Sequence, residues 1–272
     1  MKTQSIMSRG HARRAEKASH CTPAARRSAV LTRVRMGGAG IALALAGMVS
    51  APGTAAADGV LVELFTSQGC SSCPPADRIL GDVAEQPGVV ALSFHVDYWD
   101  YLGWRDTFAD ARFSHRQYAY RDSWGARVVY TPQMVVGGDL PVQGNRAVEV
   151  EDAITVAKRA QSGGRIDLKG GSMVMAELDG LPNDAVIWMA RYLQKAGVAI
   201  KRGENAGRTI EYHNVVQDFA RLGTVGEAPG ALLTLPSPGP GEGIAVWAQG
   251  GGGHGRVLAI SAFEVATPGA GG

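Results

Sequence analysis

Cysteine is scarce in this chain of 272 residues, which has three: Cys21, Cys70 and Cys73. So few cysteines exclude a disulfide-rich scaffold, in which several bridges compensate for a small hydrophobic core. Hydrophobic residues make up 45% of the chain, enough for one large core or two smaller ones. Most of the chain is therefore expected to fold.

The sequence also lacks the signatures of several enzyme and metal-binding classes. It has no G-x-S-x-G motif, which argues against a serine hydrolase. The stretch RGENAGRT, residues 202–209, has neither the lysine of a phosphate-binding P-loop nor the G-x-G-x-x-G spacing, and predicts a hairpin turn. His95, His115 and His213 occur singly, without paired metal-ligand spacing. We expect no metal and no cofactor, and a hydrogen-bonded core histidine at position 95.

Acidic residues are nearly absent from residues 1–57, which hold nine of the 27 Lys/Arg and one of the 25 Asp/Glu. This basic segment ends in an apolar stretch, residues 40–49, followed by small residues. That stretch is shorter than the roughly 20 residues that span a bilayer. We expect a signal peptide at 1–57, by a Sec or a twin-arginine route, and a soluble periplasmic or secreted protein.

The rest of the chain is mildly acidic, which argues against nucleic acid as a partner. No stable membrane insertion is expected after cleavage. Because Cys21 leaves with the signal peptide, Cys70 and Cys73 are the one pair that can bridge within the mature monomer. A bridge across so short a loop removes little entropy from the unfolded chain, so stability is a poor reason for it.

The hydrophobic pattern predicts an alternating α/β segment around the two cysteines. An apolar strand at 59–67 precedes them, and a helix at 74–88, opened by two prolines, follows them. A second strand at 89–96 completes a parallel strand–helix–strand unit. A surface helix at 107–124, antiparallel strands at 130–138 and from 140, and a helix at 146–161 come next.

After Gly164 the pattern changes to period-two alternation with turns, typical of β-structure. We expect two domains: an α/β domain at 58–162 that contains CxxC, and a mainly β companion domain at 163–266. Residues 267–272, TPGAGG, are expected to form a flexible tail.

A strand leading into CxxC at a helix start, with Thr131-Pro132 opening a later strand, is similar to the thioredoxin fold. The blocks VELFTSQGCSSCPPAD, FHVDYWDYLGW, YTPQMVV and RGENAGRTIEYHNVV resemble the secreted, thioredoxin-like bacterial proteins catalogued as domain of unknown function 1223. The resemblance implies a thioredoxin-like first domain with a cis-proline at Pro132 facing the dithiol. It implies no established reaction.

The chemistry expected of this pair is thiol–disulfide exchange, because amides and the dipole at a helix start lower the pKa of a thiol. Cys70 is then the nucleophile and Cys73 the resolving thiol. Because a residue before proline is pushed out of helical geometry, we expect Cys73 to cap the helix rather than lie inside it. Asp77, in the first turn, disfavours a thiolate, whereas the Ser71 or Ser72 hydroxyl offsets this by hydrogen bonding.

Aromatic residues crowd the segment after the strand at 89–96. Tyr98, Trp99 and Trp104 are candidate substrate-binding residues together with Thr131, because ligands collect at the carboxyl ends of parallel strands. The alternative interpretation is a cluster that packs two domains together. Asp97 is a candidate proton acceptor for Cys73.

Two functions from different classes remain open at this point. One is an exported thiol–disulfide oxidoreductase that acts on the thiols or disulfides of exported proteins. The other is a non-catalytic extracytoplasmic binding protein with a structural Cys70–Cys73 disulfide. Glu204, Asn205 and Arg208 are possible ligand contacts if their turn faces the dithiol, and His254 alone is a weak ligand.

Overall fold

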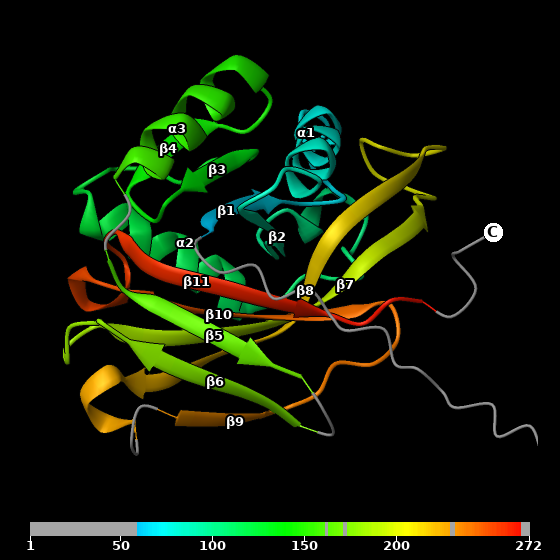
Figure 1. The fold of residues 1–272 in the computed structure, drawn as a ribbon. Coiled ribbons are helices and arrows are strands. Elements are labelled where there is room, and N and C mark those ends of the chain that lie inside the picture. The colour runs from blue at the N-terminus through cyan, green and yellow to red at the C-terminus, as the bar shows by residue number, and fades with distance from the viewer. Residues whose placement is uncertain (1–58, 161–162, 171–172, 229–231, 268–272) are drawn as a thin grey trace, which may run out of the picture. The chain divides into compact units, whose positions relative to one another are not determined.

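The computed structural model describes residues 59–160, 163–170, 173–228 and 232–267 (Figure 1). The expected signal peptide and tail residues 268–272 lie outside these ranges. The helices are α1 (Pro74–Ala84), α2 (Ala111–Ser123) and α3 (Ala147–Arg159), with short 3-10 turns η1 (Asp100–Leu102), η2 (Val225–Glu227) and η4 (Gly251–Gly253). The strands are β1 (Val60–Thr66), β2 (Val89–His95), β3 (Gln133–Val136), β4 (Leu140–Gln143), β5 (Arg165–Lys169), β6 (Met173–Asp179), β7 (Val186–Ala199), β8 (Thr209–Thr224), β9 (Leu232–Pro236), β10 (Glu242–Gln249) and β11 (Val257–Glu264).

One mixed sheet of eight strands dominates the structure, in the order β11-β10-β7-β8-β2-β1-β3-β4. It corrects the expected fold class: an α/β thioredoxin-like domain followed by a separate, mainly β domain is wrong. Strands from both sides of the expected boundary share this sheet, because β8 runs parallel to β2 through the pair Ser93 and Val215. The change in sequence pattern after Gly164 marks a run of strands, but it does not mark a domain boundary, because β7, β8, β10 and β11 join the sheet that β1 to β4 begin.

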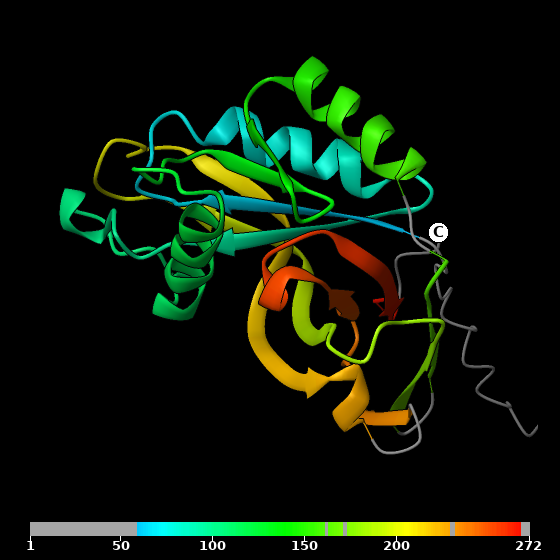
Figure 2. The ribbon, with the colours of Figure 1, turned by 90° about the vertical axis from the view of Figure 1, so that its left-hand side faces the viewer.

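The helices cover both faces of the sheet (Figure 2). Successive residues of β1 point to opposite faces, as strand geometry requires. Val60, Val62 and Leu64 pack in a core with α1 and α3. Leu61 and Phe65 belong to the core on the other face, which includes residues of α2. The helix α1, which follows the two cysteines, and the helix α2 therefore lie on opposite sides of the same strands.

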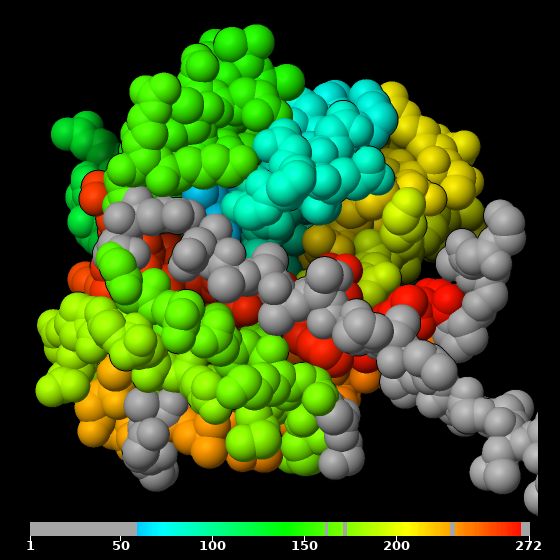
Figure 3. Space-filling model, in the orientation of Figure 1, coloured from blue at the N-terminus to red at the C-terminus, as the bar shows by residue number. Residues whose placement is uncertain are grey.

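A second, three-stranded sheet, β5-β6-β9, packs against the part of the large sheet built by β7, β10 and β11. Alternating residues of β6, Val174, Ala176 and Leu178, point into the apolar core between the two sheets. The segments β5 and β6 form the lower part of the face drawn in Figure 3. No helix among the described residues is long and apolar enough to cross a membrane.

Several local predictions are confirmed. The first strand, helix and second strand form a parallel unit, with Val60 opposite Val89 and Thr66 opposite His95. The hairpin β3–β4 is antiparallel. Helix α1 begins at the predicted proline but ends at Ala84, before Pro87-Gly88. The helices α2 and α3 lie within the predicted ranges.

Candidate redox site

The two cysteines are joined in a disulfide at the point where β1 leads into α1, and their Cα atoms are 5.4 Å apart. Two turns shape the loop: the Cys70 amide donates to the Ser67 carbonyl at 3.1 Å, and the Cys73 amide donates to the Cys70 carbonyl at 3.2 Å. The serines between the cysteines are exposed, whereas Cys70 is 5% exposed and Cys73 is fully buried. Of the two cysteines, Cys70 is therefore the more accessible.

Cys73 is the N-cap residue of α1, as predicted. Its φ of −79° and ψ of −35° are helical, so the prediction that proline drives it out of helical geometry is wrong. Pro74 and Pro75 have no amide hydrogen, and the first available amides, those of Ala76 and Asp77, both donate to the Cys73 carbonyl. The helix start thus offers a thiolate fewer free amides than an ordinary N-terminus does.

A serine hydroxyl lies close to the outer sulfur. Ser72 Oγ is 3.4 Å from Cys70 Sγ, a contact of the kind expected for the serines between the cysteines. Because the helix amides are largely occupied, this hydroxyl is the polar side chain placed to stabilise a Cys70 thiolate after reduction.

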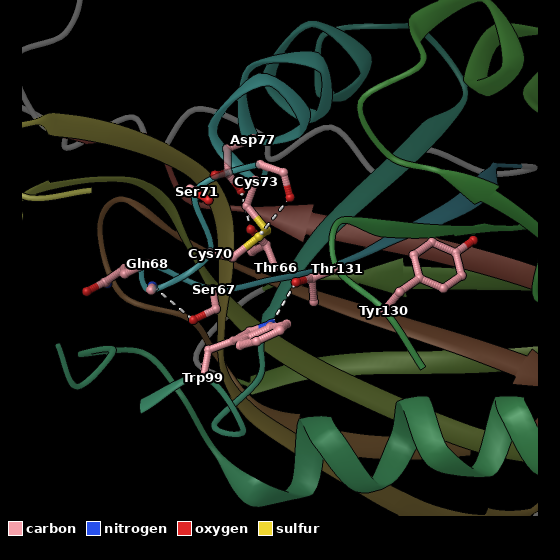
Figure 4. Close-up of a disulfide and its surroundings, with 12 residues drawn as sticks. Thr66, Ser67, Gln68, Cys70, Ser71, Cys73, Asp77, Trp99, Tyr130 and Thr131 are labelled. Atoms are coloured by element: carbon pink, nitrogen blue, oxygen red, sulfur yellow. Dashed lines mark hydrogen bonds between the residues drawn. A yellow bond between two sulfur atoms is a disulfide. The ribbon is translucent and has the colours of Figure 1, made fainter. Parts of the chain in front are cut away.

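Trp99 connects the cysteine loop with the loop that carries Thr131. Its Nε1 donates to Thr131 Oγ1 at 2.8 Å. A Cβ atom at Gly69 would lie 3.2 Å from the Trp99 carbonyl oxygen, so a glycine lets the two segments approach closely. The peptide bond between Thr131 and Pro132 is cis. Figure 4 shows Thr131 and Trp99 beside the disulfide.

The other aromatic residues predicted to bind substrate have different neighbours. Trp104 Nε1 donates to Gln68 Oε1 at 2.8 Å and thus supports the residue two before Cys70. Tyr98 points toward α2, where its hydroxyl donates to Gln117 at 2.9 Å. Asp97 accepts a hydrogen bond from Ser114 of the same helix. The contacts of Asp97 and Tyr98 with α2 place them on the face of the sheet opposite α1.

A turn between β7 and β8 forms hydrogen bonds with the backbone of the cysteine loop. Asn205 is buried, and its Nδ2 donates to the carbonyls of Gln68 at 3.0 Å and Cys70 at 2.9 Å. Glu204 Oε2 accepts from the Ser71 amide at 3.3 Å. Arg208 donates to Asn205 Oδ1 at 3.0 Å. Two of the predicted contact residues, Glu204 and Asn205, therefore bind the protein's own backbone around the cysteines, and Arg208 binds Asn205.

A buried carboxyl lies behind the disulfide, on the first turn of α1. Asp77 is 2% exposed, and its Oδ1 accepts from Thr66 Oγ1 at 2.7 Å (Figure 4). Burial raises the pKa of Asp77 to about 7, although the positive charge of His95 and the Thr66 hydrogen bond lower it. The sequence predicted a negative charge near the cysteines at this position, and it did not predict the burial of the side chain. Its helical spacing from the buried Leu80 was the available signal.

His95 and Asp106 form a second polar pair in the same interior. His95 Nδ1 lies 2.8 Å from Asp106 Oδ2, which also accepts from the Gln68 amide at 2.7 Å. Burial lowers the pKa of His95, but the charge and hydrogen bond of Asp106 outweigh this and raise it. Burial acts to raise the pKa of Asp106, and its hydrogen bonds and His95 bring it below its usual value. The core histidine predicted at position 95 is confirmed.

Three polar atoms of this interior have no hydrogen-bond partner among the described residues: Asp77 Oδ2, His95 Nε2 and the Tyr212 hydroxyl. The rings of His95 and Tyr212 are 4.8 Å apart, and the Asp77 charge raises the pKa of Tyr212 further than burial alone. These three unpaired atoms are therefore sites in the interior behind the disulfide where a proton can bind or be transferred.

An open furrow begins beside the exposed serine of the cysteine loop and has a volume of about 700 Å³. It lies between α1 and β8, which run side by side in Figures 1 and 3. Its walls include Ser71, Pro75, Arg78, Arg208 and His213. The described residues contain no cluster of His, Cys, Asp and Glu that would hold a metal ion.

Comparisons with known proteins give a family and a fold. A family model described as "Protein of unknown function (DUF1223)" matches residues 61–249. No curated protein matches the chain. A crystal structure of a protein from Agrobacterium tumefaciens is similar with a TM-score of 0.64 and 30% identity, covering 75% of this chain and 93% of that chain. HBP35 of Porphyromonas gingivalis has a TM-score of 0.53 and 12% identity over 79% of this chain and 78% of that chain, a likeness of fold alone.

Proposed function

The chain belongs to the DUF1223 family of proteins of unknown function, and we propose that it is an exported thiol–disulfide oxidoreductase that uses Cys70 and Cys73. The observation that carries the proposal is the position of the disulfide. It lies at the start of α1, with an open furrow beside the cysteine loop and a buried carboxyl behind it. A pair that served stability alone would need neither the furrow nor a carboxyl with a pKa of about 7.

In the proposed reaction the reduced protein donates two electrons to a substrate disulfide. The Cys70 thiolate attacks one substrate sulfur, which forms a mixed disulfide and releases the other substrate sulfur as a thiolate. Cys73, after losing its proton, attacks Cys70 Sγ and releases the second substrate thiolate. The protein ends with its Cys70–Cys73 disulfide and the substrate with two thiols. The reverse sequence oxidises a substrate dithiol.

Asp77 is proposed to accept the proton that Cys73 loses. It lies one helical turn after Cys73 and on the same side of α1. A carboxyl with a pKa of about 7 exchanges protons readily near neutral pH, whereas an ordinary aspartate stays ionised. The Ser72 hydroxyl is proposed to stabilise the Cys70 thiolate. Trp99, Thr131 and Pro132 are proposed to form the wall against which a substrate chain docks, and the substrates are proposed to be exported protein thiols or disulfides.

The burial of both cysteines favours a second candidate, a non-catalytic extracytoplasmic binding protein with a permanent disulfide. The reduction potential of the mature protein, measured in glutathione buffers, separates the two. A value between about −120 and −270 mV, the range of exchange catalysts, supports the proposal. A value below about −300 mV indicates a structural bridge and contradicts it.

Trapping provides the functional test. Cys73→Ser expressed with the export signal is expected to accumulate mixed disulfides through Cys70, because the resolving thiol is missing. Cys70→Ser is the matched control, and its remaining thiol is expected to trap far less because Cys73 is buried. Equal or absent trapping by the two variants would count against the proposed roles.

A further inference from the structure

The open furrow beside the cysteine loop is the first half of a longer groove. Its volume is about 700 Å³, and a second hollow of about 540 Å³ continues it along α1. The two hollows share four lining residues, Pro75, Arg78, Glu211 and His213. We call the whole the α1–β8 groove, which begins beside Ser71 in the cysteine loop and ends beside Glu85.

The groove has the length of a short extended peptide. Its α1 wall runs from Pro75 to Glu85, which is about 15 Å of helix at about 1.5 Å per residue. Because an extended chain advances about 3.3 Å per residue, the groove accommodates about five residues. Helix and strand touch beneath it, since a Cβ atom at Gly81 would lie 2.8 Å from His213 Cδ2. The groove therefore has a closed floor.

The charges along the groove change sign from one end to the other. Arg78 and Arg208 line the half next to the cysteines, whereas Asp82 and Glu85 line the far half. Spacings of four and then three residues place Arg78, Asp82 and Glu85 on one face of α1. All three of these α1 residues are exposed. The wall of the groove thus offers a cation near the disulfide and two anions further away.

The two arginines have no anionic partner that would neutralise them. Arg208 donates to Asn205 Oδ1 at 3.0 Å, and this amide carries no charge. Arg78 forms no ion pair with a carboxylate in the parts of the chain that the structure describes. An acidic side chain of a ligand is therefore attracted to the end of the groove next to the cysteines.

The other charged groups along the groove do not cancel this pattern. Glu211 lies 3.1 Å from His213 Nε2, so its carboxylate has a partner on its own strand. Glu204 accepts a hydrogen bond from the Ser71 amide and does not line the groove. Lys195 offsets one carboxylate of the far half, which still has more carboxylates than cations. A basic side chain of a ligand is therefore attracted to the far end.

We propose that the α1–β8 groove binds an extended segment of the substrate polypeptide, with an acidic side chain two residues from the substrate cysteine and a basic side chain four residues from it. The acidic side chain meets Arg78 and Arg208, and the basic one meets Asp82 and Glu85. Residues two apart on an extended chain point to the same side and are about 7 Å apart, close to the spacing of about 6 Å from Arg78 to Asp82 along α1. This substrate preference rests on the proposed exchange reaction.

The test compares two peptides of identical composition, Ala-Cys-Ser-Glu-Ser-Lys-Ala and Ala-Cys-Ser-Lys-Ser-Glu-Ala, each as a mixed disulfide with glutathione. A second pair, with the charges before the cysteine, covers the opposite chain direction. In one direction, the peptide with glutamate nearer the cysteine is expected to oxidise the reduced protein about fivefold faster, the size expected of two exposed ion pairs. The difference should shrink at about 0.5 M salt. Equal rates within both pairs overturn the proposal.

Variants locate the preference on the groove. Arg78→Glu reverses the charge at the near end and is expected to bring the ratio of the two rates to about one or below. Because the Arg78 charge also acts on Asp77, the ratio is taken within each variant, so that an effect common to both peptides cancels. Arg159→Glu on α3, outside the groove, is the matched control and should keep the wild-type ratio. An unchanged ratio in Arg78→Glu overturns the assignment.

Peptides without a cysteine separate the groove from the reaction. The same sequences with serine in place of cysteine carry a fluorophore and are titrated with the oxidised protein, and binding is followed by fluorescence anisotropy. Tighter binding of the peptide with glutamate nearer the serine, without exchange of any disulfide, supports the groove and contradicts the exchange reaction. Exchange with oxidised glutathione, without any effect of the order of charges, supports the reaction and overturns the groove.

Discussion

Two acidic side chains are buried next to β1, and their surroundings differ. Glu63 lies on the α2 face and accepts hydrogen bonds from Arg116 and Tyr120 in an ion pair that is closed to solvent. Asp77 lies on the α1 face behind the disulfide and accepts one hydrogen bond, from the neutral hydroxyl of Thr66. One acid has a cation for a partner, and the other has none in direct contact.

This difference gives the two acids different roles: Glu63 is half of a structural ion pair, whereas Asp77 is a group that can gain or lose a proton near neutral pH. A carboxylate that faces a guanidinium in the interior is held in its charged form by geometry, and removing either partner leaves an uncompensated charge. A carboxyl without a cation is held in its neutral form by burial, which is why the pKa of Asp77 rises to about 7. The protein therefore keeps its rigid ion pair on one face of the sheet and its titratable group on the face with the cysteines.

The largest expected effect comes from breaking the ion pair. Arg116→Met should lower the free energy of unfolding by about 3–5 kcal/mol, because Glu63 would remain buried without its cation. Urea denaturation of the oxidised protein at pH 7 measures this. Replacing both partners, Arg116→Met with Glu63→Leu, should recover much of the loss, since no buried charge is left. A loss below about 1 kcal/mol in the single variant would mean that the pair behaves like an exposed one.

Removing the titratable group should have a smaller, pH-dependent effect. Well below pH 3.8, its ordinary pKa, Asp77 is protonated in both the folded and the unfolded protein, and its burial then costs no charge-dependent free energy. As the pH rises to about 7 the unfolded chain ionises and the folded one does not, so wild-type stability falls across this range by up to about 4 kcal/mol. Asp77→Asn stays neutral and can still accept from Thr66.

The measurement is urea denaturation of wild type and Asp77→Asn between pH 4 and 8. The advantage of the variant should grow from pH 4 to pH 7 and then level off. Taking the difference between the two proteins removes the contributions of titratable groups that do not interact with Asp77. Parallel stability curves would show that Asp77 ionises normally in the folded protein and that its proposed role as proton acceptor is wrong.

The local elements and the place of the cysteines could be predicted from the sequence. A strand, a proline-led helix start and a second strand have strong short-range signals, and these predictions are confirmed. The sheet as a whole could not be predicted in this way. The parallel pairing of β8 with β2 joins residues more than a hundred positions apart. Period-two alternation predicts that a segment is a strand, but it does not predict which strand it pairs with.

The buried acids and their partners were also missed, for a related reason. Charged residues between aromatic ones suggested a surface helix at 107–124, yet Phe113, Arg116 and Tyr120 share one buried face of α2. Their spacing of three and four residues was visible in the sequence. The spacing did not predict the partner of Arg116. That partner is Glu63, 53 residues earlier on β1, and its carboxylate compensates the buried charge of Arg116.

The smallest expected effect tests the single hydrogen bond that Asp77 accepts. Thr66→Val keeps the β-branched shape that suits β1 and removes the hydroxyl, so stability at pH 5 should fall by about 1 kcal/mol. Because the Thr66 hydrogen bond lowers the pKa of Asp77, that pKa should rise above 7 in the variant. Its stability should then go on falling above pH 7, where the contribution of Asp77 to the wild-type curve is flat. Thr66→Ser, which keeps the hydroxyl, should follow the wild-type curve. If the stability curve of Thr66→Val instead runs parallel to that of wild type above pH 7, the Thr66 hydroxyl does not set the pKa of Asp77. The next atom to test is then His95 Nε2, which has no hydrogen-bond partner among the described residues.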